Sequence, residues 1–152
     1  MKLDETDAQI LTLLQRDARL SMRAIAKQVH LSAPSVAERV KKLEEAGIIS
    51  GYTVRIDRKK LGFLVDCLIE VTLRNGEIHR FKDFVQTCPN VVFCYCVAGR
   101  ACYIMMVAAP SLAAIEDLIN GMAPYAETVT NVIFSEVPTK SDLIWHSPRM
   151  TD

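Results

Sequence analysis

The sequence has little that would mark a secreted, membrane-spanning or metal-binding protein. Its five cysteines are an odd number with no Cys-x-x-Cys spacing, so they favour reduced, mostly buried thiols over a disulfide framework or a metal site. No apolar run reaches the ~18 residues that a membrane span needs. The first residues, MKLDETDAQI, lack the apolar segment of a signal peptide. We therefore expect a cytoplasmic protein that contacts no membrane and holds no metal.

Signatures of catalysis are also missing from the sequence. There is no glycine-rich phosphate loop, no nucleophile–base motif and no carboxylate pair in a clear setting. We expect no catalytic residues, no resident cofactor and no enzymatic activity.

The charge is balanced overall but unevenly distributed. The chain of 152 residues has room for one ordinary domain or two small ones. It carries 18 basic and 18 acidic side chains, and half of its residues are hydrophobic. Residues 1–62 hold 12 basic and 8 acidic side chains, so their net charge is +4, and the remainder carries −4. Residues 19–42 contain six basic side chains and one acidic side chain. This local excess attracts polyanions.

The first third of the sequence predicts three helices. Apolar residues recur at helical spacing in DETDAQILTLLQRDARL, and Ser21 is placed to cap the second helix. In LSAPSVAERVKKLEEAGII, Ser32 is a natural N-cap, Pro34 falls in the first turn and Gly47 suits the position after the last turn. Three short helices with a tight turn before a basic third helix are typical of a helix-turn-helix, which reads duplex DNA.

The third helix begins with small residues, and this favours an approach to DNA. A recognition helix enters the major groove by its N-terminal end, where bulky side chains would block contact and hydroxyls can meet phosphates or base edges. Arg39 and Lys42 suit phosphate or guanine contacts, and Arg23 suits the DNA backbone. A three-helix scaffold with a solvated basic face is the alternative interpretation. The residues that we expect to contact DNA are Ser21, Arg23, Ser32, Ala33, Pro34, Ser35, Glu38, Arg39 and Lys42.

The remainder of the sequence predicts a linker and a second, α+β domain. After Gly47, IISGYTVRID is typical of a short hairpin or an extended linker, and DRKKLGF marks a boundary. Strand patterns at 64–73, 91–98, 102–109 and 128–137 alternate with helical patterns in IHRFKDFVQTC and SLAAIEDLINGMAPY. This order predicts a ferredoxin-like βαββαβ fold. We expect a winged-helix-like DNA-binding domain over 1–50, a linker or extended strand over 51–63, an effector-binding and oligomerisation domain over 64–140, and a tail over 141–152.

The central strands are apolar on both faces. In VVFCYCVA, apolar side chains occupy successive positions, whereas two helices cover one face of a four-stranded sheet. An uncovered apolar face predicts self-association of two sheets.

The sequence resembles the Lrp/AsnC family of regulators over almost all of residues 3–140. The motifs are the opening LD-x-x-D-x-x-I, the segment LS-x-x-x-V-x-x-R-V-x-x-L-E-x-x-G-I-I and the exit Y-x-x-x-x-D-x-x-x-L-G. The resemblance implies a transcriptional regulator that binds or wraps double-stranded DNA. It also implies a homodimer formed through the sheet domain, commonly an octamer of four dimers, and a frequent response to amino acids.

One motif departs from the pattern of the family. Where the family usually has G-x-x-D-Y, which the resemblance places in an amino-acid pocket, this chain has Gly99, Arg100, Ala101, Cys102 and Tyr103. A thiol cannot replace the carboxylate that pairs with a ligand ammonium group, although Arg100 could hold a ligand carboxylate. The substitution resembles the LrpC-type branch. It leaves an architectural DNA-binding protein without an effector, and a thiol sensor acting through Cys102, as alternatives.

Overall fold

The computed structural model describes residues 1–138, 144, 147 and 148, and these fall into two compact units. Residues Met1–Arg55 belong to a helical unit, and Ile56–Val137 form a sheet unit. The tail predicted over residues 141–152 lies almost entirely outside the described residues. In the described part of the chain, no helix is long and apolar enough to cross a membrane.

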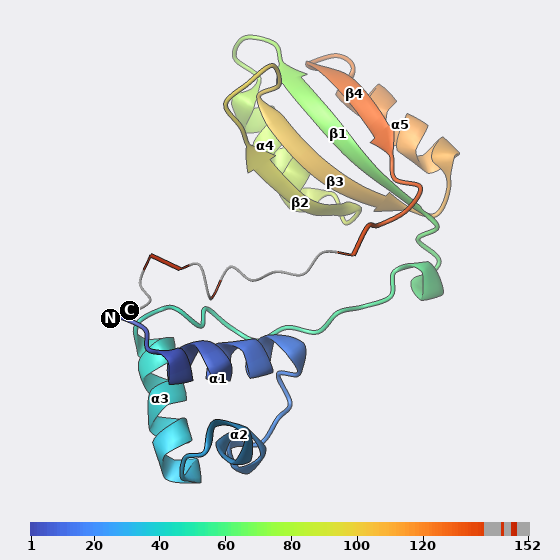
Figure 1. The fold of residues 1–152 in the computed structure, drawn as a ribbon. Coiled ribbons are helices and arrows are strands. Elements are labelled where there is room, and N and C mark those ends of the chain that lie inside the picture. The colour runs from blue at the N-terminus through green and yellow to red at the C-terminus, as the bar shows by residue number, and fades with distance from the viewer. Residues whose placement is uncertain (139–143, 145–146, 149–152) are drawn as a thin grey trace. The chain divides into compact units, whose positions relative to one another are not determined.

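The helical unit is built from three capped helices (Figure 1). As predicted, the side-chain oxygens of Ser21 and Ser32 accept hydrogen bonds from backbone N–H groups at the starts of their helices. His30 ends the second helix in the left-handed conformation, with a φ of 55°, and so turns the chain into the third within two residues. The helices are α1 (Glu5–Arg16), α2 (Met22–Val29) and α3 (Ala33–Glu45).

An apolar core fixes the orientation of α3. Its stripe of Val36, Val40 and Leu43 is buried against residues of α1 and α2, including Ile10 and Ile25. Because the stripe occupies one side of a 3.6-residue helix, the opposite side of α3 is left to solvent. The predicted DNA-contacting residues of α3 lie on or beside that exposed side.

The segment after α3 is an extended linker and contains no hairpin. Gly47, with a φ of 68°, follows the last turn of α3, as its position in the sequence indicated. Between Ile48 and Asp57 the backbone is irregular, so no wing follows α3 in this segment. A short 3-10 helix at Lys59–Leu61 precedes the sheet, and the Arg58 guanidinium donates to Asp66 at 3.1 Å. The linker is thereby attached to the first strand of the sheet unit.

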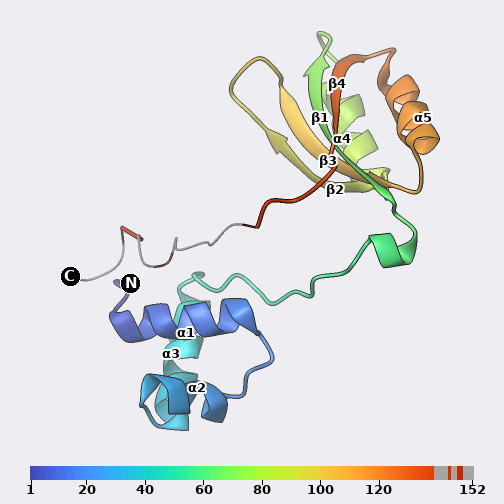
Figure 2. The ribbon, with the colours of Figure 1, turned by 45° about the vertical axis from the view of Figure 1, so that its right-hand side comes forward.

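The sheet unit has the predicted βαββαβ order, with both helices on one face of an antiparallel sheet (Figures 1 and 2). The strand order β2-β3-β1-β4 is that of a ferredoxin-like fold. The elements are β1 (Val65–Leu73), α4 (Ile78–Thr87), β2 (Val91–Cys96), β3 (Tyr103–Ala109), α5 (Leu112–Met122) and β4 (Ala126–Val132).

The last strand is shorter than the sequence pattern predicted. The pattern favoured residues 128–137, but β4 ends at Val132, and the final bond of its ladder runs from the Ile133 N–H to the Asp66 carbonyl at 2.8 Å. The partner strand β1 begins at Val65, so the chain beyond Ile133 has no strand beside it. Apolar alternation over 133–137 therefore continues without a ladder, and the Phe134 side chain is 93% exposed.

Candidate DNA interface and effector pocket

The first turn of α3 presents two bonded hydroxyl groups to solvent. The Ser32 Oγ accepts a hydrogen bond from the Ser35 N–H at 3.2 Å and lies 2.7 Å from the Ser35 Oγ. Both serines and Pro34 are exposed, and Ala33 is half-buried. The Ala33 N–H and the two hydroxyls therefore form a small polar surface without bulky side chains. The four small residues that the sequence indicated, from Ser32 to Ser35, therefore form the first turn of α3.

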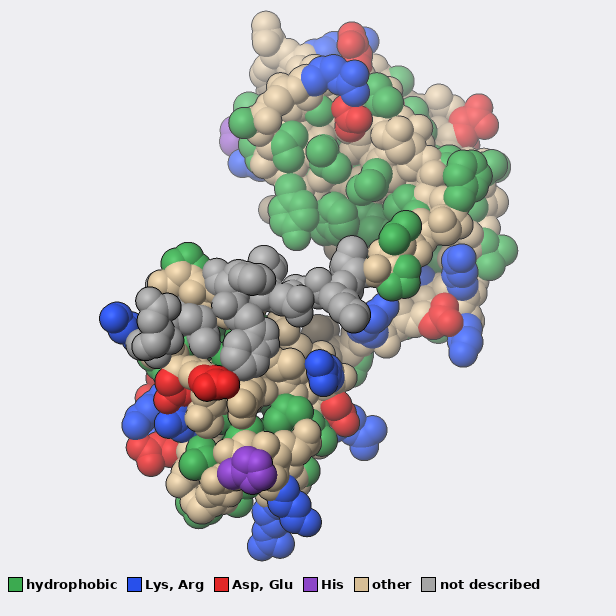
Figure 3. Space-filling model, in the orientation of Figure 1, with side chains coloured by type: hydrophobic (Ala, Val, Ile, Leu, Met, Phe, Trp, Pro, Cys, Tyr) green, Lys and Arg blue, Asp and Glu red, His purple; other side chains and the backbone are tan. Residues whose placement is uncertain are grey.

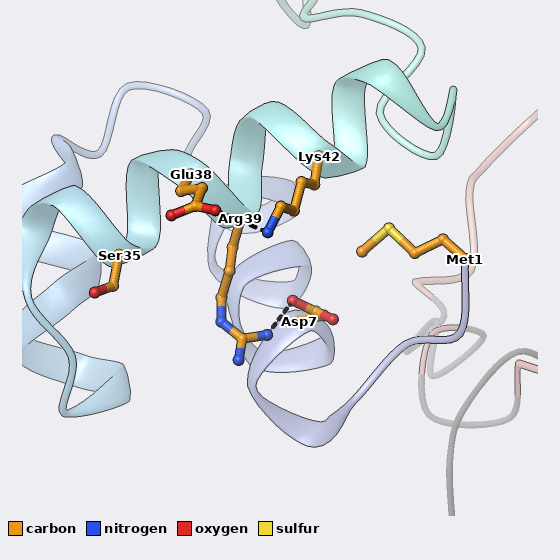
Figure 4. Close-up of a pocket in the computed structure, with 6 residues that line it drawn as sticks. All are labelled: Met1, Asp7, Ser35, Glu38, Arg39 and Lys42. Carbon is orange, nitrogen blue, oxygen red and sulfur yellow. Dashed lines mark hydrogen bonds and ion pairs between the residues drawn. The ribbon is translucent and has the colours of Figure 1, made fainter.

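A hollow of about 300 Å³ lies beside this turn, between α3 and the start of α1 (Figure 4). Four of the predicted DNA-contacting residues line it, all of them from α3. Residues from the N-terminus complete the hollow, and they were not among the predicted contacts. The lining residues are Met1, Asp7, Ser35, Glu38, Arg39 and Lys42.

Arg39 is tied to the start of α1 by two short ion pairs. Its Nη1 donates to the Asp4 Oδ2 at 2.7 Å. It also donates to the Asp7 Oδ1 at 2.7 Å (Figure 4). Asp4 and Asp7 also form a capping box at the start of α1. The hydrogen bonds that Arg39 donates, first to Asp7 and then to Asp4, raise the pKa of Arg39.

The same contacts stabilise the ionised form of Asp4. Partial burial acts to raise the pKa of Asp4, but the hydrogen bonds from the Asp7 N–H and from Arg39 outweigh it and hold that pKa below its ordinary value. The capping box was visible in the sequence as the acidic residues at positions 4 and 7. The partner of this capping box, Arg39 on α3, lies 32 residues after Asp7 and could not be recognised from the sequence.

The other basic groups of this surface remain available to a ligand. The Lys42 Nζ lies 2.8 Å from the Glu38 Oε1, and the hydrogen bond from Lys42 lowers the pKa of Glu38. Both side chains are well exposed, so the pair is weak and easily exchanged for a phosphate contact. On α2, Arg23 is exposed, and Ser21 is already used as the cap. Basic side chains project from the helical unit where α2 lies (Figure 3).

The predicted effector residues lie in the loop from β2 to β3, beside a cavity of about 560 Å³. Gly99, Ala101, Cys102 and Tyr103 line it. Arg100 does not, because its Nη2 donates to the Glu70 Oε2 at 2.8 Å, and this bond raises the pKa of Arg100. The expected role of Arg100 as the partner of a ligand carboxylate is therefore not supported by its position.

Two of the thiols, Cys67 and Cys94, are stabilised in their neutral forms. Burial raises the pKa of Cys94 and of Cys67, which favours their neutral thiol forms. In the part of the chain that the structure describes, no three His, Cys, Asp or Glu side chains gather into a possible metal site. Cys96 is exposed, and Cys102 is half-buried beside the cavity.

One face of the sheet carries no helix. Hydrophobic side chains gather over the strands on this face (Figure 3). Cross-strand neighbours include Leu68 beside Met106 and Tyr95 beside Ile104, and Tyr95 is 64% exposed. We call these residues, together with Phe93 and Val129, the open face of the sheet. The rings of Phe93 and Tyr95 lie 5.1 Å apart there.

Comparisons with known proteins cover both units. Residues 3–44 match a family model described as an AsnC-type helix-turn-helix domain, and residues 66–143 match the Lrp/AsnC ligand binding domain. The HTH-type transcriptional regulator LrpC of Bacillus subtilis is 52% identical over 141 residues, which are 93% of this chain and 98% of the relative. A solved structure of B. subtilis LrpC superposes with a TM-score of 0.88 at 53% identity, covering 92% of this chain and all of the other.

A more distant relative extends the similarity. The leucine-responsive regulatory protein of Salmonella typhimurium is 31% identical over 149 residues, which are 93% of this chain and 91% of the relative.

Proposed function

The chain belongs to the Lrp/AsnC family of transcriptional regulators, and from this premise we propose that the exposed side of α3 binds the major groove of duplex DNA. The observation that carries the proposal is the first turn of α3, where small polar residues lie beside basic side chains on one surface. The protein acts by binding rather than by catalysis. Because chromosomal DNA is its target, we also propose that it works in the cytoplasm.

The surface residues divide into three roles. Ser32, Ser35 and the backbone N–H of Ala33 approach phosphates or base edges, and Pro34, which has no N–H group, lies beside them. Lys42 and Arg23 supply positive charge to the DNA backbone. Glu38 forms an ion pair with Lys42, and Ser21 caps the start of α2. Arg39 is already paired with two carboxylates, so its main contribution is to hold α3 in place.

The salt dependence of DNA affinity tests this proposal. With wild-type protein, we expect the association constant to fall steeply as salt rises, because bound counterions are released from the DNA. Lys42→Gln removes one phosphate contact and is expected to lower the log–log salt slope by about 0.9. Lys82→Gln, an exposed substitution on α4 of the sheet unit, is the matched control and should leave the slope unchanged. An identical slope for both variants would contradict the assignment of Lys42.

The open face of the sheet supports a homodimer. Apolar side chains on the uncovered face, among them Tyr95 and Met106, are covered when two sheets pack face to face. A two-fold dimer presents two copies of α3 and predicts paired half-sites in DNA. The resemblance to the family further implies an octamer of four dimers that binds or wraps DNA.

Light scattering tests the proposed dimer. Tyr95→Lys places a charge on the open face and should lower the native mass at micromolar concentration. Gln86→Lys, on the exposed side of α4, should not lower it. A mass unchanged by Tyr95→Lys would argue against this face as the interface.

The cavity beside Gly99–Tyr103 supports binding of a small effector. The match to a ligand binding domain and the name of the leucine-responsive relative favour an effector of amino-acid origin. Footprinting with and without candidate effectors tests this function. If no small molecule changes DNA affinity, the alternative of an architectural DNA-binding protein without effector is favoured.

A further inference from the structure

Two loops that are distant in sequence form the walls of the effector cavity. Pairing of Val71 with Tyr103 brings the end of β1 beside the start of β3. The segments Leu73–Ile78 and Cys96–Tyr103 therefore line an open hollow of about 560 Å³, within the usual range for small-molecule sites. Their lining is predominantly apolar and includes Leu73, Ile78, Val97, Ala98, Ala101 and Tyr103.

The charge in this cavity has one sign. Among the described residues that line it, Arg74 is charged and none is acidic. Two acidic side chains of the neighbouring segments have other partners: Glu70 accepts the bond from Arg100, and Glu77 lies 3.9 Å from Arg80. Neither carboxylate lines the cavity.

The start of α4 adds to the positive character of the wall. Ile78 is the first residue of this ten-residue helix and lines the cavity, and no side chain caps the helix start. The partial positive charge of a helix N-terminus therefore lies on the same side as Arg74. Together with the apolar remainder, this arrangement matches a molecule that has one carboxylate and an apolar body.

A free amino acid fits these walls poorly, because its ammonium group would lie near Arg74 and the start of α4, with no carboxylate among the described lining residues to receive it. We propose that the cavity selects apolar carboxylates that lack an ammonium group over the corresponding amino acids. The proposal rests on the effector role proposed above and names the class of ligand. Arg74 then holds the carboxylate, and the apolar wall holds the aliphatic chain.

A matched pair of probes tests the proposal on the full-length protein. 4-Methyl-2-oxopentanoate and L-leucine share a carboxylate and a branched chain, and they differ in an oxo group against an ammonium group. In isothermal titration calorimetry at pH 7, we expect the 2-oxo acid to bind at least tenfold more tightly. Arg74→Gln should weaken its binding tenfold or more, whereas Lys82→Gln should not change it. Thermal unfolding of each variant verifies that it is folded.

The outcomes separate this inference from the effector role itself. Equal or tighter binding of L-leucine overturns the proposed ligand class but preserves an effector site. Binding of the 2-oxo acid that is unaffected by Arg74→Gln overturns the assignment of the cavity. Binding that leaves DNA affinity unchanged supports the ligand class and refutes the effector role. No heat from either probe at millimolar concentration overturns both.

Discussion

Arg39→Gln is expected to destabilise the helical unit more than any exposed charge on α3. The Asp7 carboxylate is only 4% exposed and loses its 2.7 Å bond from the guanidinium when Arg39 is replaced. Breaking a buried ion pair costs about 3–5 kcal/mol, and exposed pairs contribute below about 1 kcal/mol. Arg39 and Asp4 are 34% and 45% exposed, so water compensates part of the loss. We therefore expect Arg39→Gln to lower the unfolding free energy of the helical unit by about 2 kcal/mol.

The assay should report on the helical unit alone, within the intact chain. Hydrogen exchange followed by mass spectrometry measures the opening free energy of peptides from α1 and α3. A loss of about 2 kcal/mol corresponds to a shift of roughly 8–16 °C in the unfolding temperature of a small domain. Peptides from the sheet unit provide an internal reference that should not change.

Two further variants decide whether the ion pair is responsible. Lys41→Gln breaks an exposed pair with Glu45 at 3.5 Å on the same helix and should cost below about 0.5 kcal/mol. Asp7→Asn combined with Arg39→Gln removes the unpaired carboxylate and should recover part of the loss. If Arg39→Gln costs no more than Lys41→Gln, the two short bonds do not hold α3, and the role given to Arg39 is wrong.

Three other perturbations follow from the described contacts. The folded pKa of Asp4 lies below its ordinary value of 3.8, so the stability that ionised Asp4 contributes is present above pH 3.8 and is lost as pH falls through the folded pKa. Acid titration followed by circular dichroism should show this loss of stability, and the loss should be smaller in Asp4→Asn. Phe81→Ala deletes a buried ring that lies 4.7 Å from Tyr103 and should cost about 3–5 kcal/mol in urea unfolding of the sheet unit; a loss below about 1 kcal/mol would contradict its place in the core. Gly47→Ala requires a left-handed alanine at φ 68° and should cost about 1 kcal/mol at the end of α3 by hydrogen exchange; an unchanged value would show that the turn relaxes.

Local features of this fold could be predicted because their causes are local. Ser21 and Ser32 cap helices through bonds to residues three positions away, and such spacing is legible in a sequence. The alternation of strand and helix patterns likewise gave the βαββαβ order. Strand ends were less certain, since β4 stops where its partner strand begins rather than where its own apolar pattern ends.

Contacts between distant segments escaped prediction. Arg39 was placed correctly on α3, but its attachment to Asp4 and Asp7 spans 35 and 32 residues. Arg100 was proposed to meet a ligand carboxylate, yet strand pairing brings it to Glu70, 30 residues away. The pattern of the chain shows which groups carry charge, whereas the fold decides which charges are already neutralised before a ligand arrives.

If α3 binds DNA as proposed, the bonded serines at its start limit how that turn can recognise a base. Of the two hydroxyl hydrogens on Ser32 and Ser35, one lies in the 2.7 Å bridge, and either oxygen can be its donor. The turn therefore has a single hydroxyl hydrogen left to offer, and that hydrogen can be presented from either of two positions. Such a donor tolerates neighbouring acceptors in several base steps. At this turn, the preference for a base would then be broad rather than tied to one base step.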